Sequence, residues 1–184
     1  MKNAETEIRR AAPRKAFVPW ILFLLLGVAL LFIPMNALAQ QDSSDKAASL
    51  LKDSIKLFED GETDKAIEAA KESLKADPNN ADAYDQLGYM FLKKDQADEA
   101  MGAFDSALKL NPRMRTSKTG KGFVLLKKGD LKGAEAILKE ALELNPYPST
   151  THYALGLVYE KMGDYEKSVE QFKDGIKKYK SGKR

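Results

Sequence analysis

The sequence predicts an all-helical fold made of repeated helical hairpins. Landmark residues recur every 34 positions, and the apolar residues between them follow the spacing of amphipathic helices. A fixed period of this length indicates stacked units, each of which needs its neighbours to bury its apolar face. The recurring positions are the prolines Pro78, Pro112 and Pro146 and the small residues Ala66, Ala100, Ala134 and Ser168.

Residues 81–112 form the clearest unit. Small side chains at Gly88 and Ala100 allow the backbones of its two helices to approach closely, and Asn80 is expected to cap the first helix. Pro112 ends the second helix because proline cannot continue it. The apolar residues of the first helix are Tyr84, Leu87, Gly88 and Phe91, and those of the second, after a polar break at 93–96, are Ala100, Phe104, Ala107 and Leu108.

This order of residues, aromatic-x2-Leu-Gly-x2-aromatic, then Ala-x3-Phe, then Pro, resembles the tetratricopeptide repeat. Four copies cover residues 47–80, 81–114, 115–148 and 149–182. The resemblance implies a right-handed α-solenoid whose first helices line a concave groove. It also implies a protein that binds peptides or helices of other proteins, catalyses no reaction and needs no cofactor or metal.

The third repeat departs from this pattern at the start of its first helix. Residues with low helix propensity occur there, so we expect this helix to begin late or to fray. Lys118 and Lys121 replace Tyr84 and Leu87, and the poor helix formers are Thr116, Thr119 and Gly120.

Residues 1–39 have the parts of a secretory signal peptide, in the usual order. A basic stretch at 1–15 precedes an almost continuously apolar run at 17–33, and Ala37-Leu38-Ala39 provides a small-x-small cleavage site before Gln40. An uncleaved membrane anchor is the alternative, because about 17 apolar residues can just span a bilayer. Both interpretations place the repeats on the periplasmic side, after a short polar linker at 40–46.

Composition excludes several classes of function. The first 15 residues carry five basic and two acidic residues, and the remainder carries 25 of each sign, so the repeats are neutral overall. A nucleic-acid-binding protein usually has a broad basic face, which disfavours that role. The chain contains no cysteine and one histidine, His152, which excludes disulfides, thiol catalysis and the usual metal sites.

The resemblance also assigns the residues of the partner-binding groove. A row of one residue per repeat, Ile55, Tyr89, Phe123 and Leu157, suits an extended or helical apolar ligand, although packing between hairpins is an equal alternative. Apolar residues and Gln86 disfavour the capture of a carboxylate terminus known in some family members. The groove positions are Leu51, Ile55, Asp82, Asp85, Gln86, Tyr89, Lys93, Thr116, Thr119, Phe123, Lys127, Tyr153 and Leu157.

Basic residues gather at Arg113, Arg115, Lys118 and Lys121, within a run at 106–129 that contains no acidic residue. This basic cluster would attract an acidic stretch beside the partner's apolar anchors. A solvated loop and helix start is the alternative interpretation.

The last hairpin is expected to keep part of its apolar surface open. Residues 181–184 are too few for the polar helix that commonly caps such arrays. We therefore expect Val169, Phe172, Ile176 and Tyr179 to mediate self-association or docking on a larger assembly.

Two functional hypotheses follow. The first is an exported scaffold or adaptor, periplasmic or anchored in the inner membrane, that serves bacterial envelope assembly or secretion. The second is an envelope enzyme or glycan-binding module that uses scattered carboxylates, although no paired acid and base stand out among them.

Overall fold

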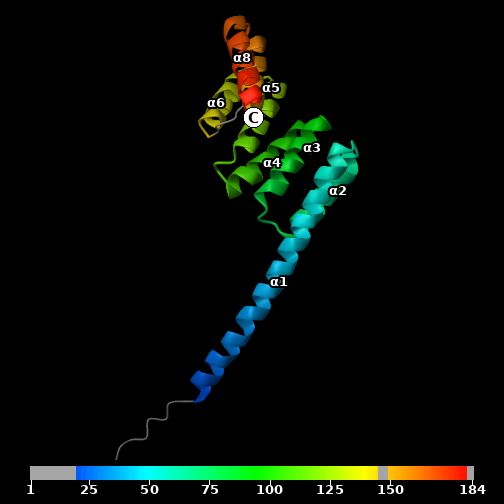
Figure 1. Ribbon diagram of the computed structural model, residues 1–184, viewed down its shortest axis with the longest axis vertical. Helices are drawn as coiled ribbons and strands as arrows, with labels where there is room; N and C mark the ends of the chain where they lie inside the picture. Colours follow the sequence, from blue (N-terminus) through cyan, green and yellow to red (C-terminus); the bar gives the residue numbers. More distant parts are fainter. Residues whose placement is uncertain (1–19, 145–148, 182–184) are drawn as a thin grey trace, which may run out of the picture. The chain divides into compact units, whose positions relative to one another are not determined.

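The computed structural model (Figure 1) describes residues 20–144 and 149–181, with side chains from residue 40 onward. It divides into two units, Met1–Gln41 and Asp42–Arg184, and the second contains the repeats. Every regular element among the described residues is a helix, which confirms the predicted all-helical class. The helices are α1 (Trp20–Glu59), α2 (Thr63–Ala76), α3 (Ala81–Lys93), α4 (Ala97–Leu110), α5 (Arg115–Lys128), α6 (Leu131–Glu143), α7 (Ser149–Met162) and α8 (Tyr165–Ser181).

The N-terminal predictions remain open. The signal peptide or anchor predicted at residues 1–39 lies outside the residues whose side chains are described. Within the described part of the chain, no helix has both the length and the apolar character that crossing a membrane requires. Residues 40–46, predicted as a linker, are helical and belong to α1, because neither glycine nor proline interrupts this stretch.

Each hairpin turns at a residue in the left-handed backbone region. Gly61, Asp95, Gly129 and Gly163 have φ values of 84°, 66°, 81° and 80°, and they recur every 34 residues. Glycine adopts this conformation without strain, whereas Asp95 is the exception among the four. The turn therefore has the same geometry in every repeat, although its residue type varies.

Among the described residues, side-chain caps hold the starts of three helices, one of them α8, where Asp164 accepts a hydrogen bond from the backbone N–H of Lys167 at 3.2 Å. The side chain of Asn80 accepts a hydrogen bond from the backbone N–H of Ala83 at 3.0 Å, which confirms the predicted cap. Asp130 does the same for Gly133 at the start of α6, at 2.9 Å. The second helix of the second repeat ends at Leu110, two residues before Pro112.

The expectation that the first helix of the third repeat begins late or frays is wrong. α5 begins at Arg115 and continues to Lys128 without a break. Two of its poor helix formers are packed against the neighbouring repeats. Thr119 is 1% exposed, and Gly120 is also buried. Tertiary packing outweighs low helix propensity at these positions because only small side chains fit there.

The core consists of successive clusters, each shared between neighbouring helices. α3 packs against α2 and α4, α5 against α4 and α6, and α7 against α6 and α8. Phe104 on α4 is fully buried and shares its cluster with Ala100 and Val124. Leu138 on α6 shares a second cluster with Ala154 on α7. Each hairpin thus completes the core of the hairpin before it.

Candidate protein-binding groove

An open hollow of about 490 Å³ lies on the first helices of the first three repeats. α1 contributes Phe58, and α5 contributes Phe123 and Lys127. α3 contributes the remaining lining residues, Gln86, Tyr89, Leu92 and Lys93. We call this hollow the groove. Aromatic and aliphatic side chains line it beside an amide and two lysines, so it offers an apolar surface with basic groups at its edge.

Tyr89 is held in place at the groove by two contacts. Its hydroxyl donates a hydrogen bond to the carbonyl oxygen of Thr116 at 2.7 Å. Its ring meets that of Phe104 edge to face, with centroids 5.1 Å apart and an angle of 78° between the planes. Burial raises the pKa of the Tyr89 hydroxyl above its usual value, so the group stays protonated and keeps donating. Tyr89 therefore joins the second repeat to the third as well as lining the groove.

The structure brings five of the residues predicted for the groove together in one hollow, namely Gln86, Tyr89, Lys93, Phe123 and Lys127. Sequence reasoning missed Phe58 and Leu92. Each lies three residues after a member of the predicted apolar row, and positions three apart share one face of a helix. Extending the row by this spacing would have found both.

Two of the predicted groove residues do not face the groove. Asp85 is 4% exposed, and its carboxylate accepts a hydrogen bond from Ser117 Oγ at 2.5 Å. Thr119 is 1% exposed, and its hydroxyl shares a hydrogen bond with that of Thr151 at 2.9 Å. Both lie at the edge of the first helix that the next repeat covers. Burial raises the pKa of the Asp85 carboxyl.

The other predicted groove positions lie apart from this hollow. Leu51 and Ile55 on α1 are half-buried, and so is Leu157 on α7. Asp82 is exposed in the first turn of α3. Tyr153 is 52% exposed and lines a second hollow at the last hairpin.

Charges around the groove are partly paired. Lys127 forms an ion pair with Asp95, whereas Lys93 has no ion-pair partner among the residues described. In the basic cluster, Lys118 pairs with Glu140 at 2.5 Å and Lys121 with Asp105 at 2.6 Å.

The basic cluster is therefore weaker than its sequence suggests. Two of its four cations are already neutralised by acidic residues of neighbouring helices. Arg113 is exposed and Arg115 half-buried. Of the two lysines that line the groove, Lys93 is consequently the one without an ion-pair partner among the described residues.

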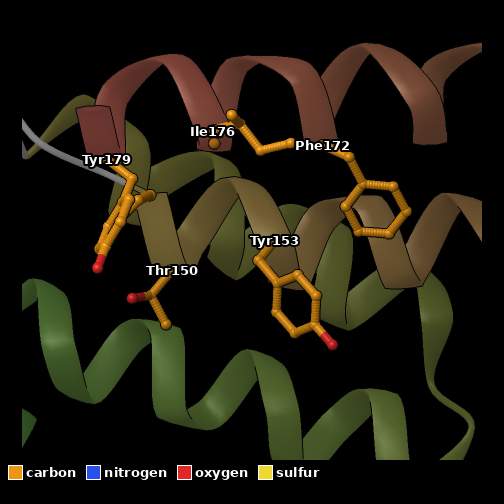
Figure 2. A pocket seen from close by; sticks show the side chains of 7 residues that line it. Thr150, Tyr153, Phe172, Ile176 and Tyr179 are labelled. Atoms are coloured by element: carbon orange, nitrogen blue, oxygen red, sulfur yellow. The ribbon is translucent and has the colours of Figure 1, made fainter. Parts of the chain in front are cut away.

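The second hollow lies between α7 and α8 and has a volume of about 500 Å³. Figure 2 shows Thr150 and Tyr153 from α7 and Phe172, Ile176 and Tyr179 from α8 around it. Three of the four residues predicted as the open C-terminal surface thus line one hollow. The fourth, Val169, is 49% exposed on α8.

The described side chains show no arrangement typical of a metal site. In residues 40–144 and 149–181, no three His, Cys, Asp or Glu residues are placed to hold an ion. His152 Nδ1 forms a hydrogen bond with Gln171 Oε1 at 2.8 Å, which ties α7 to α8.

Comparison with known proteins gives a consistent result. The tetratricopeptide repeat description matches residues 55–115 and 87–149, and a second description of the same repeat matches residues 125–181. A search of curated proteins gives no match.

Solved structures with the same repeat architecture resemble the chain. MamA from Desulfovibrio magneticus RS-1 is 27% identical with a TM-score of 0.62, over 73% of this chain and 76% of that one. PilF of Pseudomonas aeruginosa is 23% identical with a TM-score of 0.66, over 76% and 62% of the two chains. The first repeat domain of Spaghetti (RPAP3), bound to the HSP90 peptide SRMEEVD, is 22% identical with a TM-score of 0.62, over 65% and 95%.

Proposed function

This chain belongs to the tetratricopeptide repeat family, and from that premise we propose that it is an exported scaffold that binds a segment of a partner protein in its groove. Proteins with such repeats generally bind other proteins and do not act as enzymes. The segment would be an extended peptide or a helix with apolar anchors.

The groove carries this proposal. Phe58, Leu92 and Phe123 come from three different first helices, yet they line one open hollow of about 490 Å³. These side chains are half-buried, and their exposed parts favour a ligand with apolar anchors of its own. Because the hollow extends over three repeats, it fits a segment that runs across the helices.

Charge suggests the second feature of the ligand. Lys93 lines the hollow and has no ion-pair partner among the described residues, so an acidic residue beside the apolar anchors would complement it. The RPAP3 domain holds a short peptide, which makes peptide segments the first class of ligand to test on this groove.

The N-terminal sequence supports export. A basic stretch, an apolar run and the Ala37-Leu38-Ala39 site are the parts of a secretory signal, so the mature chain would begin at Gln40 in the periplasm. The alternative is an inner-membrane anchor with the repeats on the periplasmic side. In either case we propose a role in envelope assembly or secretion, because the repeats would act in that compartment. Intact mass of the native protein distinguishes the two, because retention of Met1 in the membrane fraction identifies the anchor.

The groove is tested with two adjacent lysines as a matched pair. Lys93 lines the hollow, whereas Lys94 pairs with Asp64 and does not line it. Partners captured from the envelope fraction by the wild type are quantified by mass spectrometry against Lys93→Ala and Lys94→Ala. We expect Lys93→Ala to weaken the interaction at low salt only, because salt screens exposed charges.

A further variant tests the apolar anchors. Phe123→Ala should weaken binding by about 2 kcal/mol, or roughly thirtyfold, if Phe123 is a principal anchor. Its thermal unfolding is compared with that of the wild type, since Phe123 also packs against a buried cluster. Unchanged capture by folded Phe123→Ala and Lys93→Ala proteins would exclude the groove as the binding site.

A further inference from the structure

The hollow between α7 and α8 is lined by large side chains that remain exposed. Tyr153, Ile176 and Tyr179 are 52%, 57% and 55% exposed, although all three are large and largely apolar. Phe172 is half-buried between them, with its ring 5.7 Å from that of Tyr153. No described residue forms a helix over this surface.

The equivalent surfaces of the preceding hairpins are covered. Phe172 occupies the same repeat position as Phe104 and Leu138, which are both 0% exposed. Gly120 of α5 covers Phe104 so closely that a Cβ atom there would lie 2.2 Å from the ring. Ala154 of α7 lies in the same buried cluster as Leu138. A small residue of the next first helix therefore covers this position in both cases.

The position of Tyr153 shows the same relation. It corresponds to Asp85 and Thr119, which are 4% and 1% exposed. Ser117 of α5 covers Asp85, and Thr151 of α7 covers Thr119, each through a hydrogen bond. Tyr153 is exposed because no corresponding helix follows among the described residues.

The helices that cover a hairpin with a bulky residue at the Phe104 position share one pattern, whereas α3, which covers the first hairpin with Ala70 there, has Ala83, Gln86 and Met90 instead. Each of the two, α5 and α7, has a hydroxyl residue, a small residue three positions later and a fully buried valine four positions after that. The residues are Ser117, Gly120 and Val124 on α5 and Thr151, Ala154 and Val158 on α7. The array itself thus specifies the kind of helix that fits on a hairpin of this type.

Charge on α8 bears on one more position of that helix, the residue directly after the small one, which is Lys121 on α5 and the buried Leu155 on α7. On α5, Lys121 directly follows the small residue Gly120 and pairs with Asp105 of α4 at 2.6 Å. The position of Asp105 is occupied on α8 by Lys173, so the charge there is reversed. Lys177 and Lys180 continue the same stripe of α8, and none of the three lysines forms an ion pair within the described residues. An acidic residue directly after the small one would complement this stripe.

A second copy of the chain does not supply such a helix. On α1, the first helix of the first repeat, the positions that correspond to Ser117, Gly120 and Val124 are Ser49, Lys52 and Lys56, and all three are exposed. Head-to-tail stacking would place two lysines over the apolar hollow and beside the lysines of α8. Burying unpaired cations there is unfavourable, which disfavours head-to-tail stacking and favours a different protein as the occupant.

We propose that the hollow between α7 and α8 is a docking site for an amphipathic helix of a partner protein, with the pattern Ser/Thr-x2-Gly/Ala-Asp/Glu-x2-Val. This helix takes the place that the first helix of a further repeat would occupy. The site lies on the last hairpin and is separate from the groove, so each can be tested without the other.

The test uses a fluorescently labelled synthetic helical peptide of about 16 residues that contains Ser-x2-Ala-Glu-x2-Val, a length that permits a stable helix. Anisotropy measures its binding to the full chain. We expect saturable binding that Ile176→Glu weakens at least about tenfold, because a carboxylate at the centre of the hollow loses the apolar contact. Tyr165→Glu is the matched control, because Tyr165 is 69% exposed on the same helix but does not line the hollow.

A charge exchange tests the pattern itself. A second peptide with Lys in place of Glu should bind the wild type about two- to fivefold more weakly, as expected for an exposed pair of like charges. Lys173→Glu should reverse this preference. Because Lys173 is exposed, the substitution leaves the fold intact, and circular dichroism confirms it.

Several outcomes overturn the proposal. Equal binding by the wild type and Ile176→Glu, or no binding up to about 1 mM peptide, excludes this site for such a helix. Binding that Lys93→Ala abolishes shows that the peptide enters the groove instead. Sedimentation that reveals a dimer disrupted by Ile176→Glu identifies a second copy as the occupant.

Discussion

Two glycines in helices offer a direct measure of how tightly the repeats are packed. Gly120 on α5 meets the ring of Phe104, where an added Cβ would lie 2.2, 2.4 and 2.7 Å from three ring carbons. Gly102 on α4 has no atom within 4 Å of the corresponding position. The same substitution, glycine to alanine, should therefore have opposite effects at these two sites.

The expected magnitudes follow from the contact distances. Carbon atoms pack at about 3.5 to 4.0 Å, so Gly120→Ala forces a displacement of more than about 1 Å. The Phe104 ring cannot retreat easily, because Gly88 of α3 also lies close to it, where an added Cβ would be 2.5 Å from the ring. Overpacking of this kind lowers the unfolding free energy by about 1 to 3 kcal/mol, and the higher helix propensity of alanine offsets up to about 1 kcal/mol of that loss. We expect a net loss of about 1 to 2 kcal/mol.

Gly102→Ala should instead raise the free energy of unfolding by about 0.5 to 1 kcal/mol, since only the helix propensity changes. Urea unfolding of both variants, followed by far-UV circular dichroism, measures the difference. A double-mutant cycle adds a second check, because Phe104→Ala should cost less in the Gly120→Ala background than in the wild type. If Gly120→Ala stabilises the protein as much as Gly102→Ala does, α5 does not contact Phe104 as described.

Three further predictions concern single residues. Burial raises the pKa of the Asp85 carboxyl, so the folded state binds a proton there more tightly than the unfolded state does. The stability that this proton contributes is complete below the unfolded pKa and is lost as pH rises through the folded pKa. Asp85→Asn keeps an acceptor for Ser117, so at pH 7 it should be at least as stable as the wild type. At pH 3 the wild-type carboxyl is protonated, and the variant should lose this advantage. Urea unfolding at both pH values measures the difference, and an equal difference at both would contradict the prediction. Asp95 has a left-handed backbone at φ 66°, which glycine adopts without strain. Asp95→Gly should therefore raise the unfolding free energy by up to about 1 kcal/mol, minus the contribution of the lost ion pair with Lys127. An unfolding free energy below that of the wild type would show that Asp95 is not strained. Ser54 is fully buried, and its hydroxyl has no hydrogen-bond partner among the described residues, so Ser54→Ala should raise the urea midpoint. A lower midpoint would reveal a partner.

The repeat architecture was predictable because it depends on periodicity. Prolines, small residues and apolar stripes recur every 34 positions, which indicates hairpins regardless of how they pack. Local chemistry likewise predicted the cap at Asn80. Much of the groove was also predictable, because Gln86, Tyr89 and Lys93 share one face of α3.

Local propensity failed in the third repeat. Thr119 and Gly120 are poor helix formers, and their sequence indicated a frayed start. The structure shows why they are there, since Thr119 bonds to Thr151 and Gly120 admits the ring of Phe104. These contacts come from residues 16 and 32 positions away, which no local pattern reveals.

What the sequence determined by itself is the set of residues that share a face in each repeat. Whether such a face is core or surface was decided only by the tertiary structure. Asp85, Thr119 and Tyr153 hold the same repeat position and are 4%, 1% and 52% exposed. The physical reason is that a helix of the next repeat covers the first two but not the third, and burial depends on that neighbour rather than on the residue's own place in the period.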